Sequence, residues 1–496
     1  MRPAYYQDQW KQLKDSTDAV AIASLAQRIA SSFVDRYFYS DEYNAGYIEL
    51  LCAMATHYRD PDLNQVAARA LFGIVIERLC DDFEELQTET YNRLICQVIS
   101  YLRQLPDGEE LDRELNGFQL ESEDQLYQRI ESIRLSPDEK ISAKLRPKKV
   151  LILSRVTIGA DVAITSVICQ RVASLFPDAA ITIAGNPKLK QLFSSESGIK
   201  FHELNYSRKG GLLERFLVWL DLLKEVRAEL NGLSEEEFLV LDPDSRLTQL
   251  GVLPLVPSKN YRFFNSRGKQ GYPAKASISE LTNLWLDNIL GHSEFCFPKI
   301  WPEDSSLTSA ENLKILLDPK NELTLITLNF GVGGNTRKMV PGDFEIELVL
   351  TLLKDPDVHI ILDLGFGDEE RERSEAILNA AQNSAYKTRE LPFSKLNELD
   401  KSYRLIGVQC SVSEIAALIS CSDEFLGYDS ACQHIAAAEG IKTYTVFAGT
   451  NNVRFIRRWH ACGPNVSEIV YVDTISKEHN IDAKEIIARI VDLRRP

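Results

Sequence analysis

Residues 1–140 place their apolar side chains at helical spacing. Four segments carry the pattern most clearly: residues 18–38, 42–58, 64–80 and 89–105. Between them stand the turn signals SDE and RDPD, and LPDGEE follows the fourth segment. No stretch of this region alternates apolar and polar residues as a strand would. The pattern predicts an all-helical domain over residues 1–140, with about five or six helices.

After the basic segment KLRPKK (144–149) the rhythm changes to short, wholly apolar runs separated by helical patterns. Such alternation predicts βαβ units on parallel sheets. Two successive cycles are visible, one over residues 148–300 and one over 320–490, with strands expected at 150–154, 180–185, 238–242 and 261–265, then at 323–331, 358–365, 403–407, 424–429 and 443–449. The expected fold is therefore α/β, with two Rossmann-like, doubly wound domains facing a cleft behind the all-α N-terminal domain.

Composition and charge exclude some classes of function for this chain. A chain of 496 residues needs more than one core, and its net charge of −16 disfavours a nucleic-acid partner. The charge is uneven, because residues 1–140 carry 26 acidic and 14 basic side chains, a net −12, and the remainder carries −4. The nine cysteines lack paired metal spacing, and neither a transmembrane run nor a signal-peptide core is found in the sequence. We expect a cytoplasmic protein without a structural metal or a disulfide framework.

The first expected strand of the 148–300 domain ends in a glycine turn that carries an aspartate. The segment SRVTIGADVAITS places Asp161 at the start of the following helix. A carboxylate there stabilises a helix N-terminus. It can also accept a proton from a hydroxyl group within hydrogen-bond reach. Capping and general-base duty both stay open for this residue.

Two strand ends of the 320–490 domain suit an anion. NFGVGGNTRKMVPGDF combines flexible glycines with Arg337 and Lys338, which fits a diphosphate but also an ordinary basic loop. EFLGYDSACQHIAAAEG places Asp429 and Ser430 in a turn and His434 one helical turn later. The alternative there is a simple N-cap with a packed histidine. A Ser/His/Asp triad is disfavoured, since no GxSxG elbow surrounds Ser430.

Residues 154–185, RKMVP (337–341) and residues 426–450, in that order, resemble the ADP-heptose:lipopolysaccharide heptosyltransferases of glycosyltransferase family 9. The resemblance spans about residues 148–490 and implies a GT-B fold. It also implies inverting transfer from a nucleotide sugar, with ADP as the favoured nucleotide and without a bound metal or other cofactor. Asp161 would then be the general base, and Lys338 would stabilise the leaving diphosphate.

The same resemblance implies a set of donor contacts, namely Arg337, Lys338, Glu369, Asp429, Ser430, Ala431 and His434. The chain departs from the family at three points. Ala160 precedes the aspartate where the family has glycine, Val340 replaces a tryptophan, and Ala431 replaces a glycine beside the donor phosphate. The candidate base Asp161 and the cation Lys338 are retained.

Polar loops of the 148–300 domain are candidate acceptor contacts, with ordinary solvated loops as the alternative. The residues are Arg208, Lys209, Asp242, Arg246, Gln249 and Arg267. The acidic helical domain disfavours direct attachment to anionic lipid, so a glycan or protein acceptor is expected. A peripheral membrane contact through KLRPKK stays open. The helical domain is expected to mediate protein contact or oligomerisation, or to cap the acceptor cleft.

The leading hypothesis is a heptosyltransferase-like glycosyltransferase. The first alternative is a nucleotide-sugar-binding protein that has lost catalysis and acts through its helical domain. Retention of Asp161 and Lys338 argues against it, and the altered glycines argue for it. A second alternative is another GT-B enzyme, such as a sugar-nucleotide 2-epimerase.

Overall fold

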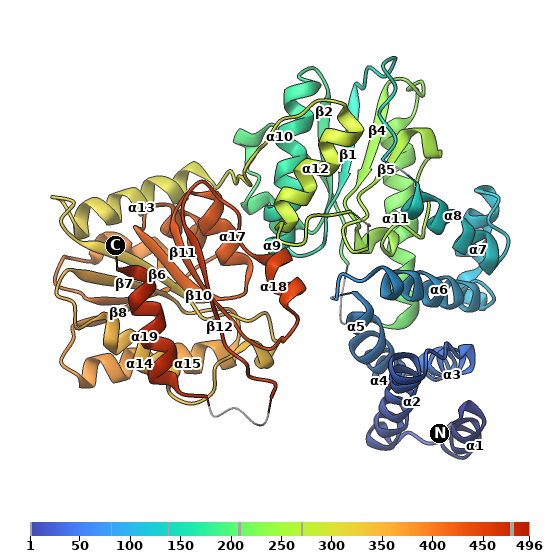
Figure 1. The fold of residues 1–496 in the computed structure, drawn as a ribbon, viewed down its shortest axis with the longest axis horizontal. Helices are drawn as coiled ribbons and strands as arrows, with labels where there is room; N and C mark the ends of the chain where they lie inside the picture. Colours follow the sequence, from blue (N-terminus) through green and yellow to red (C-terminus); the bar gives the residue numbers. More distant parts are fainter. Residues whose placement is uncertain are drawn as a thin grey trace.

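The computed structural model describes residues 2–80, 82–136, 138–206, 210–268, 271–476 and 481–495. Figure 1 shows a helical region and two α/β domains, with the helical region lying against the first α/β domain. The helical region consists of α1 Pro3–Leu13, α2 Ala19–Ser40, α3 Ala45–Thr56, α4 Pro61–Ala70, η1 Leu71–Ile76, α5 Glu77–Cys80, α6 Glu85–Leu102, η2 Pro106–Gly108, α7 Glu109–Gly117 and α8 Glu123–Leu135. It contains no strand among its described residues, so the all-helical prediction is confirmed.

The first α/β domain is built on a five-stranded sheet in the order β3-β2-β1-β4-β5, with every pair parallel. Its strands are β1 Lys149–Leu153, β2 Ala180–Gly185, β3 Lys200–Glu203, β4 Phe238–Asp242 and β5 Tyr261–Phe263. Its helices are α9 Ile158–Ala160, η3 Asp161–Thr165, α10 Ser166–Leu175, η4 Pro187–Gln191, η5 Ser195–Ser197, α11 Leu212–Leu230, η6 Arg246–Thr248, η7 Ser258–Asn260 and α12 Ile278–Leu290. The strand order reverses beside β1.

The second α/β domain has a seven-stranded parallel sheet in the order β12-β11-β10-β6-β7-β9-β8. Its strands are β6 Thr324–Asn329, β7 Val358–Asp363, β8 Thr388–Pro392, β9 Leu405–Gln409, β10 Glu424–Tyr428, β11 Lys442–Phe447 and β12 Ser467–Tyr471. Its helices are α13 Asp304–Leu317, η8 Thr336–Lys338, α14 Phe344–Leu352, α15 Asp368–Asn383, η9 Phe393–Glu398, α16 Val412–Ser420, α17 Ala431–Ala438, α18 Val453–Trp459 and α19 Ala483–Arg494. The predicted fold class is thus confirmed in its two Rossmann-like parallel sheets and its helical region.

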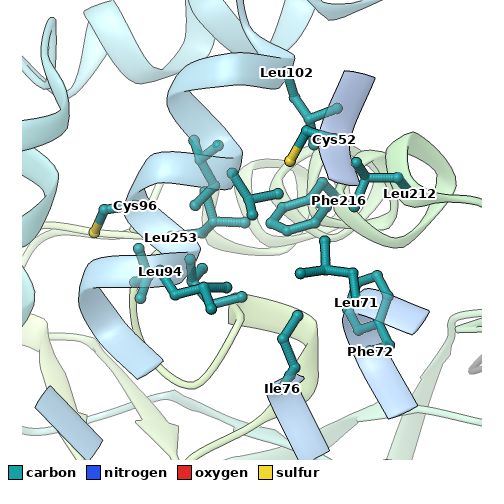
Figure 2. Packing of buried hydrophobic residues seen from close by; sticks show 14 of the residues in the cluster. Cys52, Leu71, Phe72, Ile76, Leu94, Cys96, Leu102, Leu212, Phe216 and Leu253 are labelled. Carbon is teal, nitrogen blue, oxygen red and sulfur yellow. The ribbon is translucent and has the colours of Figure 1, made fainter. Parts of the chain in front are cut away.

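The helical region and the first α/β domain share one hydrophobic core. Leu71, Phe72 and Leu94 of the helices pack against Phe216 of α11 and Leu253 of the loop after η6, as Figure 2 shows. Charged pairs line the rim of this contact, with Arg227 of α11 2.6 Å from Glu114 of α7. The buried contact removes apolar side chains of both parts from water, which stabilises them as one body.

A second buried cluster runs from the first α/β domain into the second. It joins Ile152 and Ile168 of the first domain with Leu325, Phe425 and Ile435 of the second. Polar contacts reinforce the junction, since the backbone N–H of Val412 donates to the side-chain oxygen of Gln191 at 2.8 Å. The two α/β domains therefore pack directly against each other.

One helical stretch, Ile158–Leu175, is long and apolar enough by composition to cross a membrane, with a mean hydropathy of 1.3. It corresponds to α9, η3 and α10. In the structure 67% of this stretch is buried inside the molecule, where Val167 and Ile168 belong to the second apolar cluster. Its hydrophobicity is therefore used in packing the first α/β domain.

Candidate functional site

The three sequence motifs lie at the carboxyl ends of strands, at the positions where the strand order of each sheet reverses. In the first sheet β1 lies between β2 and β4, and in the second β6 lies between β10 and β7. Ligands of doubly wound domains bind outside the carboxyl ends of the strands at such points. The segments that follow β1, β6 and β10 carry the three motifs singled out in the sequence. The fold thus places all three at expected ligand-binding positions.

Two of these strand ends touch across the domain boundary. We call Thr157–Asp161 the α9 turn and Asp429–Ala431 the α17 turn. A methyl group built on Gly159 would lie 3.1 Å from Cα of Ala431 and 3.2 Å from Cδ2 of His434. Only a glycine permits so close an approach without displacing a neighbour. The predicted acceptor-side and donor-side motifs are therefore in direct contact.

Asp161, the last residue of the α9 turn, is fully buried. Its Oδ2 accepts a hydrogen bond from the Ser154 hydroxyl at 2.7 Å, and its Oδ1 accepts bonds from the Thr165 hydroxyl at 2.7 Å and the Arg155 backbone N–H at 2.8 Å. Burial raises the pKa of Asp161 to about 6, although these hydrogen bonds oppose the shift. In this structure the carboxylate holds the end of β1 against the helix that follows.

Lys338 and Asp429 form the charged centre of the donor side. Lys338 Nζ donates to the Asp429 carboxylate at 2.5 Å and to its backbone carbonyl at 3.1 Å. The lysine side chain is 24% exposed and that of the aspartate 8%. Gln433, one turn along α17, donates to the other carboxylate oxygen of Asp429 at 2.6 Å. The ammonium group of Lys338, which follows the glycine-rich loop of residues 331–335, is thus held against the α17 turn. Part of the lysine side chain remains exposed to solvent.

The backbone around Arg337 and Lys338 is fixed from the opposite side. The Thr474 hydroxyl donates to the carbonyl of Arg337 at 3.0 Å and accepts from the N–H of Gly449 at 2.8 Å. Gly449 has a φ of +77°, and a Cβ there would lie 2.7 Å from the Arg337 carbonyl oxygen. Only glycine fits this position. The Arg337 side chain is exposed on this anchored turn.

The remaining predicted donor residues take different positions. Glu369 lies exposed in the first turn of α15, whereas its neighbour Glu370 turns inward and accepts the N–H of Phe366 at 2.8 Å. Ser430 is the N-cap of α17, and its hydroxyl contacts Asn329 Oδ1 at 3.4 Å. Ala431 begins the helix. The two neighbouring carboxylates thus differ in exposure, and a donor contact by Glu369 stays a prediction.

His434 is buried at the boundary between the two α/β domains. It is 4% exposed and packs edge-on against Trp459 of α18, with ring centroids 6.0 Å apart. Burial lowers the pKa of His434 to about 4, so the imidazole is neutral at physiological pH. This geometry makes it a packed histidine between α9, α17 and α18.

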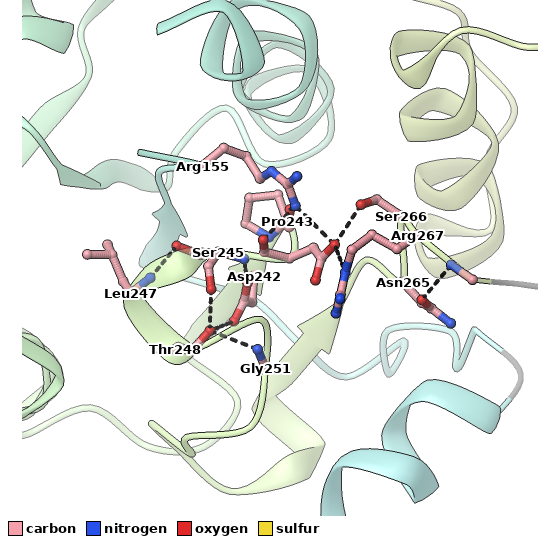
Figure 3. Close-up of polar contacts among 12 residues, drawn as sticks. Arg155, Asp242, Pro243, Ser245, Leu247, Thr248, Gly251, Asn265, Ser266 and Arg267 are labelled. Carbon is pink, nitrogen blue, oxygen red and sulfur yellow. Dashed lines mark hydrogen bonds and ion pairs between the residues drawn. The ribbon is translucent and has the colours of Figure 1, made fainter. Parts of the chain in front are cut away.

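Two of the predicted acceptor residues, Asp242 and Arg267, belong to buried networks at the carboxyl ends of β4 and β5 (Figure 3). Asp242 accepts from Thr248 at 2.5 Å and from Tyr261 at 2.6 Å, and its pKa is raised to about 6 by burial. Arg267 donates to Asp244 at 2.9 Å and stacks over Tyr91 of α6, with 4.6 Å between the guanidinium and the ring centroid. These contacts are internal to the fold.

The structure describes two of the other four acceptor candidates. Gln249 is buried and donates to the carbonyl of Arg215 at 3.1 Å. Arg246 is half-buried at the start of η6. Arg208 and Lys209 lie outside the described residues. The helical region adds to this burial, because Arg267 lies over Tyr91 of α6 and Arg129 of α8 donates to the carbonyl of Gly251 at 2.7 Å. An acceptor contact by these side chains stays a prediction.

Sequence reasoning missed a polar cluster beneath the donor side. Asn329, the last residue of β6, donates to Asp363 at the end of β7 over 2.6 Å and accepts from the N–H of Gly331 at 3.2 Å. Burial raises the pKa of Asp363 to about 6. The signal available in the sequence for this cluster was a polar residue at the end of each apolar strand, Asn329 in β6 and Asp363 in β7. Gln433 and Trp459 carried no comparable signal, since their partners lie on other elements.

Residues 372–485 match the sequence profile of glycosyltransferase family 9 (heptosyltransferase). This segment resembles that family. The matched residues run from α15 to the start of α19 and include the α17 turn and His434, while Asp161 and Lys338 lie outside them. The resemblance found in the sequence is therefore confirmed for the donor-side half of the second domain. It supports nucleotide-sugar glycosyl transfer, and hence a transferase.

Several solved structures are similar to the chain. A family 9 glycosyltransferase from Veillonella parvula is 13% identical, with a TM-score of 0.46 and coverage of 69% of this chain and 91% of that one. The ADP-heptose LPS heptosyltransferase II of E. coli is 14% identical, with a TM-score of 0.44 and coverage of 70% and 98%. The E. coli heptosyltransferase WaaC with ADP is 15% identical, with a TM-score of 0.44 and coverage of 69% and 99%. No curated protein sequence matches the chain.

Proposed function

We propose that this chain is an inverting, metal-independent glycosyltransferase of the cytoplasm. It moves a sugar from a nucleotide-sugar donor, with ADP the favoured nucleotide, to a hydroxyl group of a glycan or protein acceptor. The observation that carries the proposal is the contact of the α9 turn with the α17 turn, which brings the candidate base and the candidate donor site to one place. The family match over residues 372–485 supports the same chemistry.

On the donor side, Lys338 binds the diphosphate. Its ammonium group is anchored by Asp429 and remains partly exposed, so an incoming phosphate can share it. Negative charge grows on the diphosphate as the sugar leaves, and a fixed cation stabilises that charge in the transition state. Arg337 adds a second cation on the same anchored turn, and the N–H groups at the start of α17 face the same strand ends.

On the acceptor side, Asp161 accepts the proton of the attacking hydroxyl group. A pKa of about 6 leaves the carboxylate ionised at neutral pH and basic enough to share a proton in the transition state. The side chain is fully buried, so this role requires the α9 turn to move away from α17 when the acceptor binds. Domain movement of this kind is a common step in two-domain enzymes.

The burial of Asp161 also favours the second candidate function, a nucleotide-sugar-binding protein without catalysis. Three hydrogen bonds already satisfy the carboxylate within the fold, which suits a structural role. In that case the donor side binds its ligand and the helical region carries the biological activity. The two candidates share the donor site and differ in whether Asp161 reaches a substrate.

The experiment that tests the proposal has two stages. A thermal-shift screen of ADP, GDP, UDP and dTDP and their sugars should find one nucleotide that raises the Tm of the intact chain. Failure of every nucleotide to do so would remove the donor site and both candidates with it. The selected donor is then used in a transfer assay against candidate glycans and peptides.

The second stage separates the candidates with Asp161→Asn, which keeps the shape of the side chain and removes the base. Catalysis predicts a loss of transfer of at least ~100-fold with donor affinity unchanged. Transfer at the wild-type rate would exclude Asp161 as the base. Donor binding without transfer to any acceptor, in wild type and variant alike, would favour the binding protein. Thr165→Val, which removes one partner of the carboxylate, is the control for local packing.

A further inference from the structure

The loop between α5 and α6 reaches from the helical region to the second α/β domain. Asp82 accepts a hydrogen bond from the side-chain amide of Asn452 at 2.9 Å. The carbonyl of Phe83 accepts from Arg454 at 2.8 Å, and Glu84 forms an ion pair with the same guanidinium at 2.7 Å. Three consecutive residues thus contact the start of α18. We call residues 82–84 the latch.

The side chain of Phe83 is the buried centre of the latch. It is 7% exposed and lies between two rings of α18, with centroid distances of 6.5 Å to Phe455 and 6.3 Å to Trp459. Its backbone adopts a φ of +53°, a conformation that a bulky residue rarely takes. Such strain persists only where the surroundings hold the residue in place. The apolar and polar contacts to α18 supply that hold.

From Phe83 a line of ring contacts leads to the candidate site. Trp459 packs on Phe83 from one side and on His434 from the other, at 6.0 Å. His434 in turn borders Gly159 in the α9 turn. The end of α18 is also tied to the first α/β domain, since Arg458 donates to the carbonyl of Pro273 at 2.9 Å. The position of α18 therefore bears on the contact between the α9 and α17 turns.

We propose that the latch is a positioning element through which the helical region sets the α17 turn against the α9 turn. The helical region and the first α/β domain form one body through their shared core, and the latch is the contact of the helical region with α18, beside the contact that Arg458 makes with the first α/β domain. Phe83 and Arg454 are the positioning residues. The inference concerns the fold of the unliganded chain and does not depend on the proposed transfer reaction.

Hydrogen–deuterium exchange of the full-length chain tests the latch without any substrate. Phe83→Leu keeps an apolar side chain and removes the ring contacts, while Arg454→Ala removes the two polar contacts from a half-exposed position. Each is expected to speed amide exchange at least tenfold in residues 431–438 and 453–459, with the strands of the first sheet unchanged. Tyr39→Ala, at a residue 83% exposed on α2, and Arg113→Ala, from an exposed ion pair on α7, are the matched controls.

Each outcome decides the inference. Unchanged exchange over α17 and α18 in both latch variants would overturn it, even if Phe83→Leu lowers the Tm, because a lower Tm alone indicates only that the buried Phe83 ring contributes to packing. If Phe83→Leu fails to fold, Arg454→Ala alone carries the decision. Once a donor is known, a latch variant should also raise its Kd. That result is separable from failure of the proposed function, in which the wild-type chain itself binds no nucleotide.

Discussion

Lys338 reaches from the glycine-rich loop to Asp429, with Nζ 2.5 Å from the carboxylate and 3.1 Å from the backbone carbonyl oxygen. The pair is held in the unliganded chain by Gln433 on one side and by the anchored Arg337 turn on the other. Under the proposed function, a diphosphate that enters here would find its cation already oriented, which would lower the entropy cost of binding.

Lys338→Ala should weaken binding of the selected nucleoside diphosphate at least tenfold, because a charge-assisted hydrogen bond contributes about 1.5–3 kcal/mol. Isothermal titration calorimetry measures the change. Lys354→Ala, at an exposed lysine just beyond α14, is the matched control and should bind normally. Equal affinities for wild type and Lys338→Ala would place the diphosphate elsewhere.

Gln433→Met should loosen Asp429 and with it Lys338. The substitution keeps the length of a fully buried side chain and removes the donor to Asp429. Losing this bond should lower the free energy of unfolding by about 1–3 kcal/mol and weaken diphosphate binding. Urea unfolding and calorimetry report the two effects. Gln170→Met, which removes the hydrogen bonds to the backbone carbonyls of Ser166 and Phe297 outside the site, controls for the general cost of the change. A stability loss without an effect on binding would separate Gln433 from the site.

Asp161→Asn should change the pH dependence of stability. The pKa of Asp161 is about 6 in the folded chain against 3.8 for an exposed aspartate, so between these values the folded state holds a proton that the unfolded state has lost. Wild-type stability should therefore fall relative to the variant as the pH rises from 4 to 7, by about 2 kcal/mol. Asp242 and Asp363 titrate in both proteins and cancel. Urea unfolding at pH 4, 5, 6 and 7 measures the difference, and parallel curves would contradict the raised pKa.

Gly159→Ala should separate the two turns. The added methyl group would lie 3.1 Å from Cα of Ala431, so α9 or α17 must shift. We expect a loss of about 1–3 kcal/mol in stability and faster amide exchange in α17. Gly73→Ala is the matched control, because no atom lies within 4 Å of its added methyl group, and it should be neutral or stabilising by about 0.5–1 kcal/mol. Equal behaviour of the two variants would show that the contact is not tight.

Removal of residues 1–140 should leave a chain that aggregates. The deletion uncovers Leu212 and Phe216 of α11, which the helices otherwise bury. Phe216→Ala in the intact chain, which should cost about 3–5 kcal/mol, tests the same contact without truncation. Size-exclusion chromatography of the truncated chain and thermal unfolding of the variant are the measurements. A monomeric, folded fragment 141–496 would show that the helical region is an independent domain.

The central strands could be predicted from the sequence, whereas among the edge strands only β5 was predicted, which begins with the buried residues Tyr261 and Arg262. The segments at 180–185 and 238–242 match β2 and β4 residue for residue, because these strands are buried on both faces and read as continuous apolar runs. The predictions omitted β3, β8 and β12, which lie at sheet edges and are largely exposed or half-buried. Their residues mix polar and apolar types, so no periodic signal separates them from loops.

Local pattern alone singled out Asp161, Lys338 and Asp429 as candidates, because each stands in the segment that follows a buried strand. Their contacts could not be predicted in this way. The burial of Asp161 and the pairing of Lys338 with Asp429 depend on elements far apart in the chain. The burial of Arg267 depends on Tyr91 of α6, which a reading of the β5 segment alone does not include. Long-range packing thus decided what each polar residue does.

The core shared by the helices and α11 also sets an order of events during synthesis. Helices α1–α8 leave the ribosome first, while the residues of α11 that cover their apolar faces follow about a hundred residues later, roughly 5–20 s at ordinary elongation rates. Until then Leu71, Phe72 and Leu94 have no native partner from α11. We expect the nascent helical region to depend on chaperones during this interval, and its many acidic groups to keep it dispersed.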